Sequence, residues 1–244
     1  MGKNPNIEKV VRQHAEMNSF FAGDFAIRAS STTQKSVKAE ESNNDVTKEL
    51  EKIAAEVRQC RKCGLSSLRT NAVPGEGNSN ARIMFVGEGP GADEDAQGRP
   101  FVGRAGQLLD KVITAMGLKR SDVFIGNILK CRPPDNRDPR PEEIISCLPY
   151  LQRQIELVNP EVIVALGAHA ARTLLNNNKS IGQLRGQFHQ YYAGLGRAPI
   201  KLMATYHTAY LLRNYSLENR ERVWEDMKKV LAELGLPIPE RHRK

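Results

Sequence analysis

The stretch R-I-M-F-V-G-E-G-P-G-A-D-E-D, residues 82–95, decides the fold of this chain. Its first half is a short, continuous apolar run with β-branched side chains, which is typical of a strand buried on both faces of a sheet. Three later segments have the same character, and they occupy residues 122–129, 161–167 and 201–207. The sequence therefore predicts four buried strands, each followed by a turn or loop.

Apolar residues at helical spacing fill the intervals between these strands. The pattern predicts one helix that leads to Cys60 and others over residues 103–116, 141–158, 168–175 and 216–234. Strands and helices that alternate in this way form a parallel sheet with helices on both sides. We therefore predict an α/β fold of three layers, α/β/α, around a central, mainly four-stranded parallel sheet.

The chain divides by composition into an extension and one folded domain. Residues 29–47 are rich in Ser, Thr and charged side chains, and such a stretch buries too little apolar surface to offset its ordering entropy. We predict an N-terminal extension and flexible linker over residues 1–47, and a monomeric folded domain over residues 48–244.

No apolar run approaches the ~20 residues that cross a bilayer, and the polar start lacks a signal-peptide core. An intracellular protein of the cytoplasm or nucleoid is expected.

The formal net charge of +8 is unevenly placed. Residues 1–47 carry six basic and six acidic side chains, so the whole surplus belongs to residues 48–244. A basic domain suits a polyanionic partner such as DNA, because each neutralised phosphate releases a counterion. Charge alone is equally compatible with a role in solubility.

The chain has four cysteines, Cys60, Cys63, Cys131 and Cys147, and the first two form a C-x2-C pair. Disulfides are disfavoured in a reducing compartment, so this set indicates a metal or cluster site. Four thiolates can hold either zinc or an iron–sulfur cluster, and the cysteine pattern alone leaves both open.

Loops at the predicted C-terminal strand ends carry polar residues, and ligands bind parallel sheets at this edge. The glycines of residues 87–95 let backbone N–H groups approach a ligand, although an ordinary βα turn has a similar composition. Asn127 offers an amide able to read the edge of a pyrimidine, and His207 can stabilise a developing oxyanion. Taken singly, either residue is more often structural. The apolar pair Leu211 and Leu212 in a polar loop indicates a wedge that enters a DNA duplex.

These motifs, in this order, resemble those of family 4 uracil-DNA glycosylases, the cluster-containing branch of that superfamily. The resemblance covers roughly residues 50–234 and rests on the cysteine pattern, G-E-G-P-G…D-E-D…G-R-P-F-V-G, N-I-L-K-C-R-P-P and H-x-x-Y-L-L-R. It implies an α/β/α fold, a [4Fe–4S] cluster on the four cysteines, and hydrolytic removal of uracil from DNA without strand cleavage. It therefore favours the iron–sulfur cluster over zinc.

The resemblance also implies roles for matched residues. The implied catalytic residues are Glu88, which would lie beside the attacking water, and His207, which would face the uracil O2 where negative charge builds. Phe101 would stack on the flipped base, and Asn127 would bond its polar edge. The full set implied to bind uracil is Gly89, Glu94, Phe101, Asn127 and His207. The residues expected to contact DNA are Arg132, Leu211, Leu212 and Arg213.

The chain departs from the family at Thr208, where the family has proline after the motif histidine. This change removes a fixed φ and restores a backbone donor.

A related glycosylase-like protein that becomes covalently trapped on DNA carries its histidine in a basic insertion, but residues 128–143 contain no histidine. A non-catalytic DNA-binding module is another alternative, and the presence of Glu88, Asn127 and His207 together argues against it.

The N-terminal arm has no counterpart in the minimal family domain. Met17, Phe20 and Phe21 resemble the clamp-binding motifs of DNA repair enzymes in their spacing, which predicts a contact with a sliding clamp. The motif departs from that pattern at His14, where glutamine is favoured. The alternative is an arm that folds back onto its own domain through the same three side chains.

Overall fold

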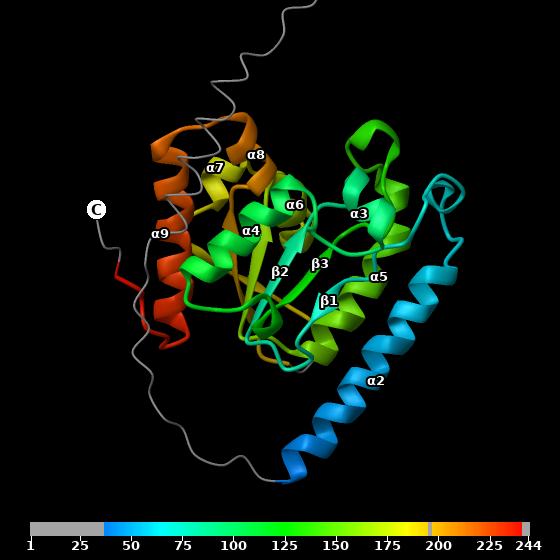
Figure 1. Ribbon diagram of the computed structural model, residues 1–244, viewed down its shortest axis with the longest axis horizontal. Coiled ribbons are helices and arrows are strands. Elements are labelled where there is room, and N and C mark those ends of the chain that lie inside the picture. The colour runs from blue at the N-terminus through cyan, green and yellow to red at the C-terminus, as the bar shows by residue number, and fades with distance from the viewer. Residues whose placement is uncertain (1–36, 195–196, 241–244) are drawn as a thin grey trace, which may run out of the picture.

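The computed structural model describes residues 37–194 and 197–240, with side chains from residue 44 onward. Its centre is a six-stranded sheet in the order β1-β3-β2-β4-β6-β5 (Figure 1). The strands are β1 (Glu76–Gly77), β2 (Ile83–Gly87), β3 (Phe124–Asn127), β4 (Val162–Leu166), β5 (Phe188–Tyr191) and β6 (Ile200–Thr205). The four predicted strands form the parallel centre of the sheet, β3-β2-β4-β6, which confirms that part of the fold prediction.

Two antiparallel edge strands complete the sheet and were not predicted. β1 pairs with β3, and β5 pairs with β6. β1 has only two residues, and β5 has a single buried side chain, Tyr191. Neither strand therefore has the continuous apolar run by which a buried strand is found in a sequence.

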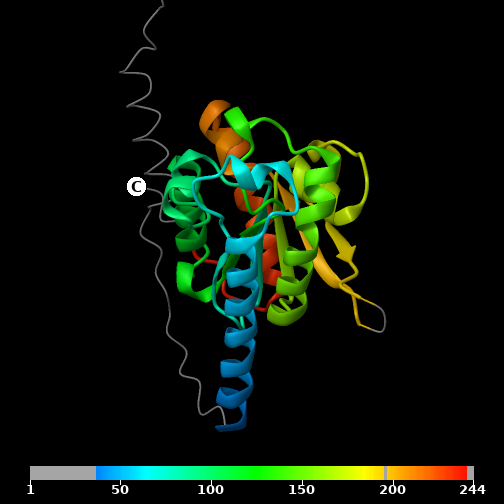
Figure 2. The same ribbon diagram turned by 90° about the vertical axis from the view of Figure 1, so that its right-hand side faces the viewer.

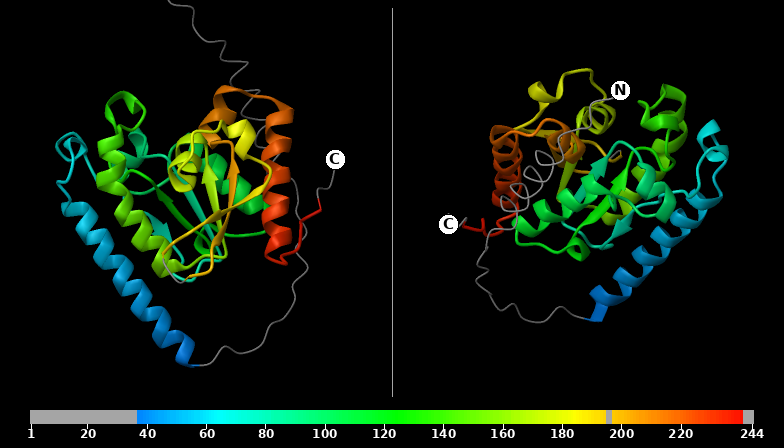
Figure 3. Two further views of the ribbon diagram at one scale, coloured as in Figure 1. Left: turned by 180° about the vertical axis from the view of Figure 1, so that it is seen from behind. Right: turned by 45° about the horizontal axis from the view of Figure 1, so that its top comes forward.

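Helices cover both faces of the sheet, as the three-layer prediction requires (Figure 2). The helices on one face are α4 (Arg104–Ala115), α8 (Thr208–Arg213) and α9 (Leu217–Glu233). The helices on the other face, seen from behind in the left half of Figure 3, are α5 (Pro141–Val158), α6 (Ala168–Leu175) and α7 (Ile181–Leu184). Successive strand residues point to opposite faces, so Phe85 of β2 belongs to the first core and Met84 to the second.

A further helix, α2 (Val37–Gln59), lies along α5 outside the three layers (Figure 1). Buried Ile53 and Val57 join Tyr150 of α5 in a third apolar cluster, and Arg153 Nη2 donates to Glu56 Oε1 at 2.9 Å. Because α2 begins at Val37, the prediction of a flexible linker over residues 29–47 is wrong from Val37 onward. Packing against α5 stabilises the apolar half of the helix. The residues before it are rich in Lys, Ala and Glu, which extend a helix at a small cost in free energy.

Some predictions concern parts of the chain that the structure does not describe. The clamp motif at His14, Met17, Phe20 and Phe21 lies outside the described residues. Within the described ranges, no helix is both long enough and apolar enough to cross a membrane.

Gly106 allows α4 to pack against the backbone of Phe101. A Cβ at Gly106 would lie 2.0 Å from the carbonyl group of Phe101, whereas a Cβ at Gly182 in α7 would meet its nearest neighbour at 3.9 Å. We expect Gly106→Ala to lower the free energy of unfolding by about 1–3 kcal/mol through overpacking. The matched variant Gly182→Ala should raise it by up to about 1 kcal/mol, because alanine favours a helix. Urea denaturation measures both changes, and equal stability of the two variants would contradict this packing.

Candidate active site

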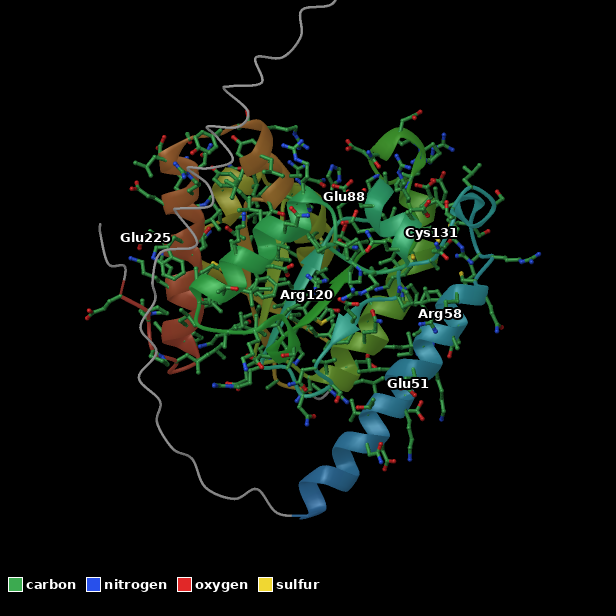
Figure 4. The ribbon with its side chains drawn as sticks, in the orientation of Figure 1. Glu51, Arg58, Glu88, Arg120, Cys131 and Glu225 are labelled. Atoms are coloured by element: carbon green, nitrogen blue, oxygen red, sulfur yellow. The ribbon has the colours of Figure 1, made fainter. Side chains whose placement is uncertain are left out.

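A cavity of about 450 Å³ opens at the C-terminal edge of the parallel strands, where this fold predicts a ligand site. The loops after β2, β3 and β4 contribute to its walls, together with α8. The predicted site residues that line it are Glu88, Gly89, Glu94, Phe101, Asn127, His207 and Arg213. Figure 4 shows Glu88 at this edge, above the central strands in that view. Three widely separated motifs therefore meet at one cavity.

Asn127 is the last residue of β3 and lines the cavity while only 2% exposed. Parallel pairing sets it beside Gly87 of β2. A Cβ at Gly87 would lie 2.5 Å from Asn127 Oδ1, so glycine lets the amide occupy this place. This buried oxygen accepts no hydrogen bond from any residue that the structure describes. An unpaired buried carbonyl is costly, so this oxygen is available to accept a hydrogen bond from a group that enters the cavity.

Phe101 forms an aromatic wall of the cavity. Its φ of +50° is a left-handed conformation that is rare for a bulky residue. Arg120 supports this turn, because it donates to the Phe101 carbonyl oxygen at 3.2 Å and pairs with Glu76 at 3.0 Å and Asp110 at 2.7 Å. The centroids of the Phe101 and His207 rings are 5.6 Å apart. Both rings therefore border the same space as the Asn127 amide.

His207 is held in one tautomer by the start of α8. It caps this helix, and its Nδ1 accepts a hydrogen bond from the Ala209 N–H at 3.0 Å. The neutral ring must then carry its proton on Nε2. Burial lowers the pKa of His207 to about 4, with Arg213 acting in the same direction and Glu94 opposing it. Near pH 7 the residue is therefore a neutral N–H donor.

Glu94 shapes the cavity through its own backbone contacts. It lies in α3 (Ala92–Gln97), and its Oε1 accepts from the N–H groups of Val102 at 2.8 Å and Gly103 at 2.9 Å. Its Oε2 accepts from the Gly91 N–H at 3.1 Å. Both carboxylate oxygens are thus engaged by the chain. The structure supports a role in positioning the loop, whereas the sequence predicted a direct uracil contact.

Glu88 follows β2 and shares its side of the cavity with Asp138 and His169, neither of which was selected from the sequence. Burial raises the pKa of the Glu88 carboxyl, while His169 lowers it, Asp138 raises it and Arg213 lowers it. The predicted strand over residues 161–167 ends at this edge, and His169 lies in the first turn of the helix that follows. That position was the only sequence signal for it.

All four cysteines line a second, smaller cavity. Figure 4 shows Cys131 on the side of the molecule that carries α2. Arg69 Nη1 donates to Cys131 Sγ at 3.0 Å, and the Lys130 N–H donates to Cys147 Sγ at 3.1 Å. Burial raises the pKa of Cys147 to about 11, so this thiol keeps its proton near neutral pH unless a metal displaces it. Four cysteines around one cavity, two of them with N–H donors, fit a thiolate-held metal group.

Comparisons with known proteins identify the family. Residues 74–228 match the model of the uracil DNA glycosylase superfamily. The type-4 uracil-DNA glycosylase of Saccharolobus solfataricus is 49% identical over 191 residues, which are 76% of this chain and 87% of that protein. Its counterpart in Thermotoga maritima is 50% identical over 182 residues, 74% and 92% of the respective chains. This chain belongs to the type-4 uracil-DNA glycosylases. A type-5 uracil-DNA glycosylase of Pyrobaculum aerophilum is more distant, at 33% identity over 178 residues.

The residues of this type-4 uracil-DNA glycosylase that were expected to contact DNA lie in different environments. Leu211 is 1% exposed and packs in the core, so its predicted DNA contact is wrong in this structure. One turn of α8 directs both Thr208 and Leu211 inward, which leaves Leu212 partly exposed and Arg213 exposed beside it. Arg132 donates to Asn136 Oδ1 at 2.9 Å from the loop after β3. The predicted wedge is therefore reduced to Leu212.

Thr208, where the type-4 pattern has proline, is the first residue of α8. Its hydroxyl is buried and has no hydrogen-bond partner within the described part of the chain. His207 before it has φ −66° and ψ 140°, a conformation that suits a residue preceding proline. The first N–H of a helix lacks a partner within that helix. Proline is therefore compatible with this backbone.

We expect Thr208→Pro to raise the free energy of unfolding by about 1 kcal/mol, because it restricts the unfolded chain and removes an unpaired hydroxyl. Thermal denaturation measures this change. Thr208→Val removes the hydroxyl alone and separates the two contributions. A loss of stability in Thr208→Pro would show that the Thr208 N–H has a partner that the fold needs.

Proposed function

We propose that this protein hydrolyses the N-glycosidic bond of deoxyuridine in DNA, releasing free uracil and leaving an abasic site. The observation that carries the proposal is the buried Asn127 amide, whose Oδ1 has no partner among the described residues. It faces a cavity that is also walled by the Phe101 and His207 rings. Such a site is complementary to a flat pyrimidine with a donor–acceptor edge.

Asn127 and Phe101 would recognise the base once it has been extruded from the helix. The uracil N3–H would donate to Asn127 Oδ1, and the Asn127 Nδ2–H would donate to the uracil O4. Cytosine presents an acceptor at N3 and a donor at N4, so it would leave Oδ1 and Nδ2 each facing a like group. Phe101 would stack on the ring. The pocket would thus bind uracil in preference to cytosine, because bound cytosine would leave buried polar groups of Asn127 unpaired.

His207 would act on the leaving group. As the bond between C1′ and N1 breaks, its electron pair passes to the uracil ring and negative charge develops on O2. The neutral His207 Nε2–H can donate to this oxygen without giving up its proton, since its pKa of about 4 keeps it neutral near pH 7. The contact strengthens as the charge grows, so it favours the transition state over the bound substrate.

Glu88 would act on the sugar side of the same bond. Its carboxylate can stabilise the oxocarbenium-like sugar, orient water toward C1′ and accept the proton that the water releases. Partly exposed Leu212 would meet the duplex beside the extruded base, and exposed Arg213 would meet a phosphate. DNA as the substrate agrees with the expected cytoplasmic or nucleoid location.

We also propose that Cys60, Cys63, Cys131 and Cys147 hold a [4Fe–4S] cluster. Ligands of one tetrahedral zinc ion lie about 3.8 Å apart, from a Zn–S distance of about 2.3 Å. Among the described residues, no three cysteine sulfurs all lie within 4.8 Å of one another. This spacing is wide for one zinc ion and supports a larger metal group. When bound, the cluster would supply a cross-link between the chain after α2 and the Cys131–Cys147 segment.

Asn127→Ala should reduce single-turnover uracil release from a uracil-containing oligonucleotide by at least about 100-fold, because two buried hydrogen bonds to the base are lost. Affinity for uracil-free DNA should stay nearly unchanged, since phosphate contacts remain. The matched control is Asn80→Ala, an exposed asparagine outside the cavity, which should retain full activity. No release of uracil by the unaltered protein would refute the proposed function, and equal losses of DNA affinity and excision would refute the role of Asn127.

Protein purified anaerobically should be brown, with broad absorbance near ~400 nm and about four iron atoms per chain. Cys131→Ser, which alters a buried ligand, should lower both iron content and thermal stability. The control variant is Ser66→Ala. Ser66 lines the same cavity but is not a proposed ligand, so this variant should retain the iron. Stoichiometric zinc in a colourless protein would exclude the cluster.

Sliding-clamp binding through residues 14–21 and the monomeric state remain predictions. The clamp contact can be tested with a deletion of residues 1–36, the segment that precedes α2. That deletion should abolish clamp binding and leave excision from short oligonucleotides unchanged, because the described domain is kept whole.

A further inference from the structure

We propose that His169 is a positioning residue for uracil excision, whose imidazolium lies between Glu88 and Asp138 and keeps the Glu88 carboxylate charged and turned into the cavity. The inference rests on the proposed function, because it concerns the carboxylate assigned to the sugar and the water. It adds a residue that neither the motifs nor the implied family roles include.

The three side chains come from three different strand ends. Glu88 follows β2, Asp138 lies in the segment between β3 and α5, and His169 lies in the first turn of α6. His169 Nε2 is 3.4 Å from Asp138 Oδ1 and 4.0 Å from Glu88 Oε2. One oxygen from each carboxylate and this nitrogen all lie within 4.8 Å of one another. His169 Nε2 is therefore within ion-pair distance of both carboxylates.

The three side chains differ in their exposure to solvent, and this difference sets how strongly their charges interact. The side chains of Glu88 and His169 are 32% and 35% exposed, whereas that of Asp138 is 81% exposed. Water screens Asp138 well, so its attraction for the imidazolium is weak. Glu88 is less solvated and depends more on a nearby cation to remain charged.

The other charged groups at the cavity leave His169 and Arg213 as the cations that act on Glu88. Among the described residues that line the cavity, Arg137 is paired with Glu143 at 2.6 Å, and Glu94 is held by backbone N–H groups. Of these two cations, His169 is the one that lies between Glu88 and Asp138.

The direction of the pH effect follows from these contacts. Burial raises the pKa of Glu88 above its ordinary value, His169 lowers it, and Asp138 raises it. Glu88 therefore takes up its proton at a higher pH than an ordinary carboxyl group does. The excision rate should decline on the acid side as Glu88 becomes neutral, and His169 should set where that decline begins.

Single-turnover excision rates measured from about pH 5 to 8 test the inference in variants of His169, Asp138 and Glu88. His169→Gln should move the acid limb of the pH–rate profile to higher pH by roughly half a unit or more, because the cation beside Glu88 is lost. His169→Lys keeps a cation and should restore the limb toward its original place. Asp138→Asn should move the limb to lower pH. Glu88→Gln should give a reduced rate without this limb.

Opposite shifts in His169→Gln and Asp138→Asn would support the proposal, because general damage to the loops cannot produce both. The control is His189→Gln, which alters a histidine that contacts the Leu184 carbonyl outside the cavity and should leave the profile unchanged. Uracil release with a limb that stays in place in both variants would overturn the inference and leave the proposed function intact. A rate lost with EDTA and restored by Mg²⁺ would assign the three groups to a cation and also overturn it.

Discussion

Parallel pairing between β2 and β3 is the constraint on which the site depends. It sets Gly87 beside Asn127, and the absence of a side chain at Gly87 leaves room for both the Asn127 amide and the Phe101 ring. The same register continues into the loops, where the N–H of Leu129 donates to the Glu88 carbonyl oxygen at 2.9 Å. The amide and the carboxylate thus have positions fixed by backbone hydrogen bonds, which is the preorganisation that catalysis requires.

The polar groups around the cavity divide into those that hold the structure and those left free for a ligand. Glu94 is engaged by three backbone N–H groups, and Arg120 holds the strained turn at Phe101. Asn127 Oδ1 has no partner within the described residues, and the tautomer of His207 is set by a backbone donor. Engaged groups provide rigidity, and the free groups can then meet a substrate without rearrangement.

The cysteine cavity is built on a different interaction, the packing of α2 against α5. Ile53, Val57 and Tyr150 form an apolar cluster that includes Cys131 and Cys147. The segment after α2 brings Cys60 and Cys63 to these buried thiols. The Lys130 N–H to Cys147 contact lies directly after Leu129, so the cysteine cavity and the active-site cavity share one short segment after β3. The proposed cluster would therefore be linked through this segment to the edge that carries Asn127.

The sequence by itself determined the four parallel strands, the helices between them and the motifs at their ends, because continuous apolar runs and helical spacing are local signals. It also supplied Glu88, Asn127, His207 and the four cysteines. Only the tertiary structure decided the half-exposed edge strand β5, the helical start of α2, the inward direction of Leu211 and the engagement of Glu94 by three backbone groups. His169 belongs to this second group. Its contact with Glu88 joins residues from two different strand ends, and such a distance is fixed by the sheet as a whole, which no local pattern encodes.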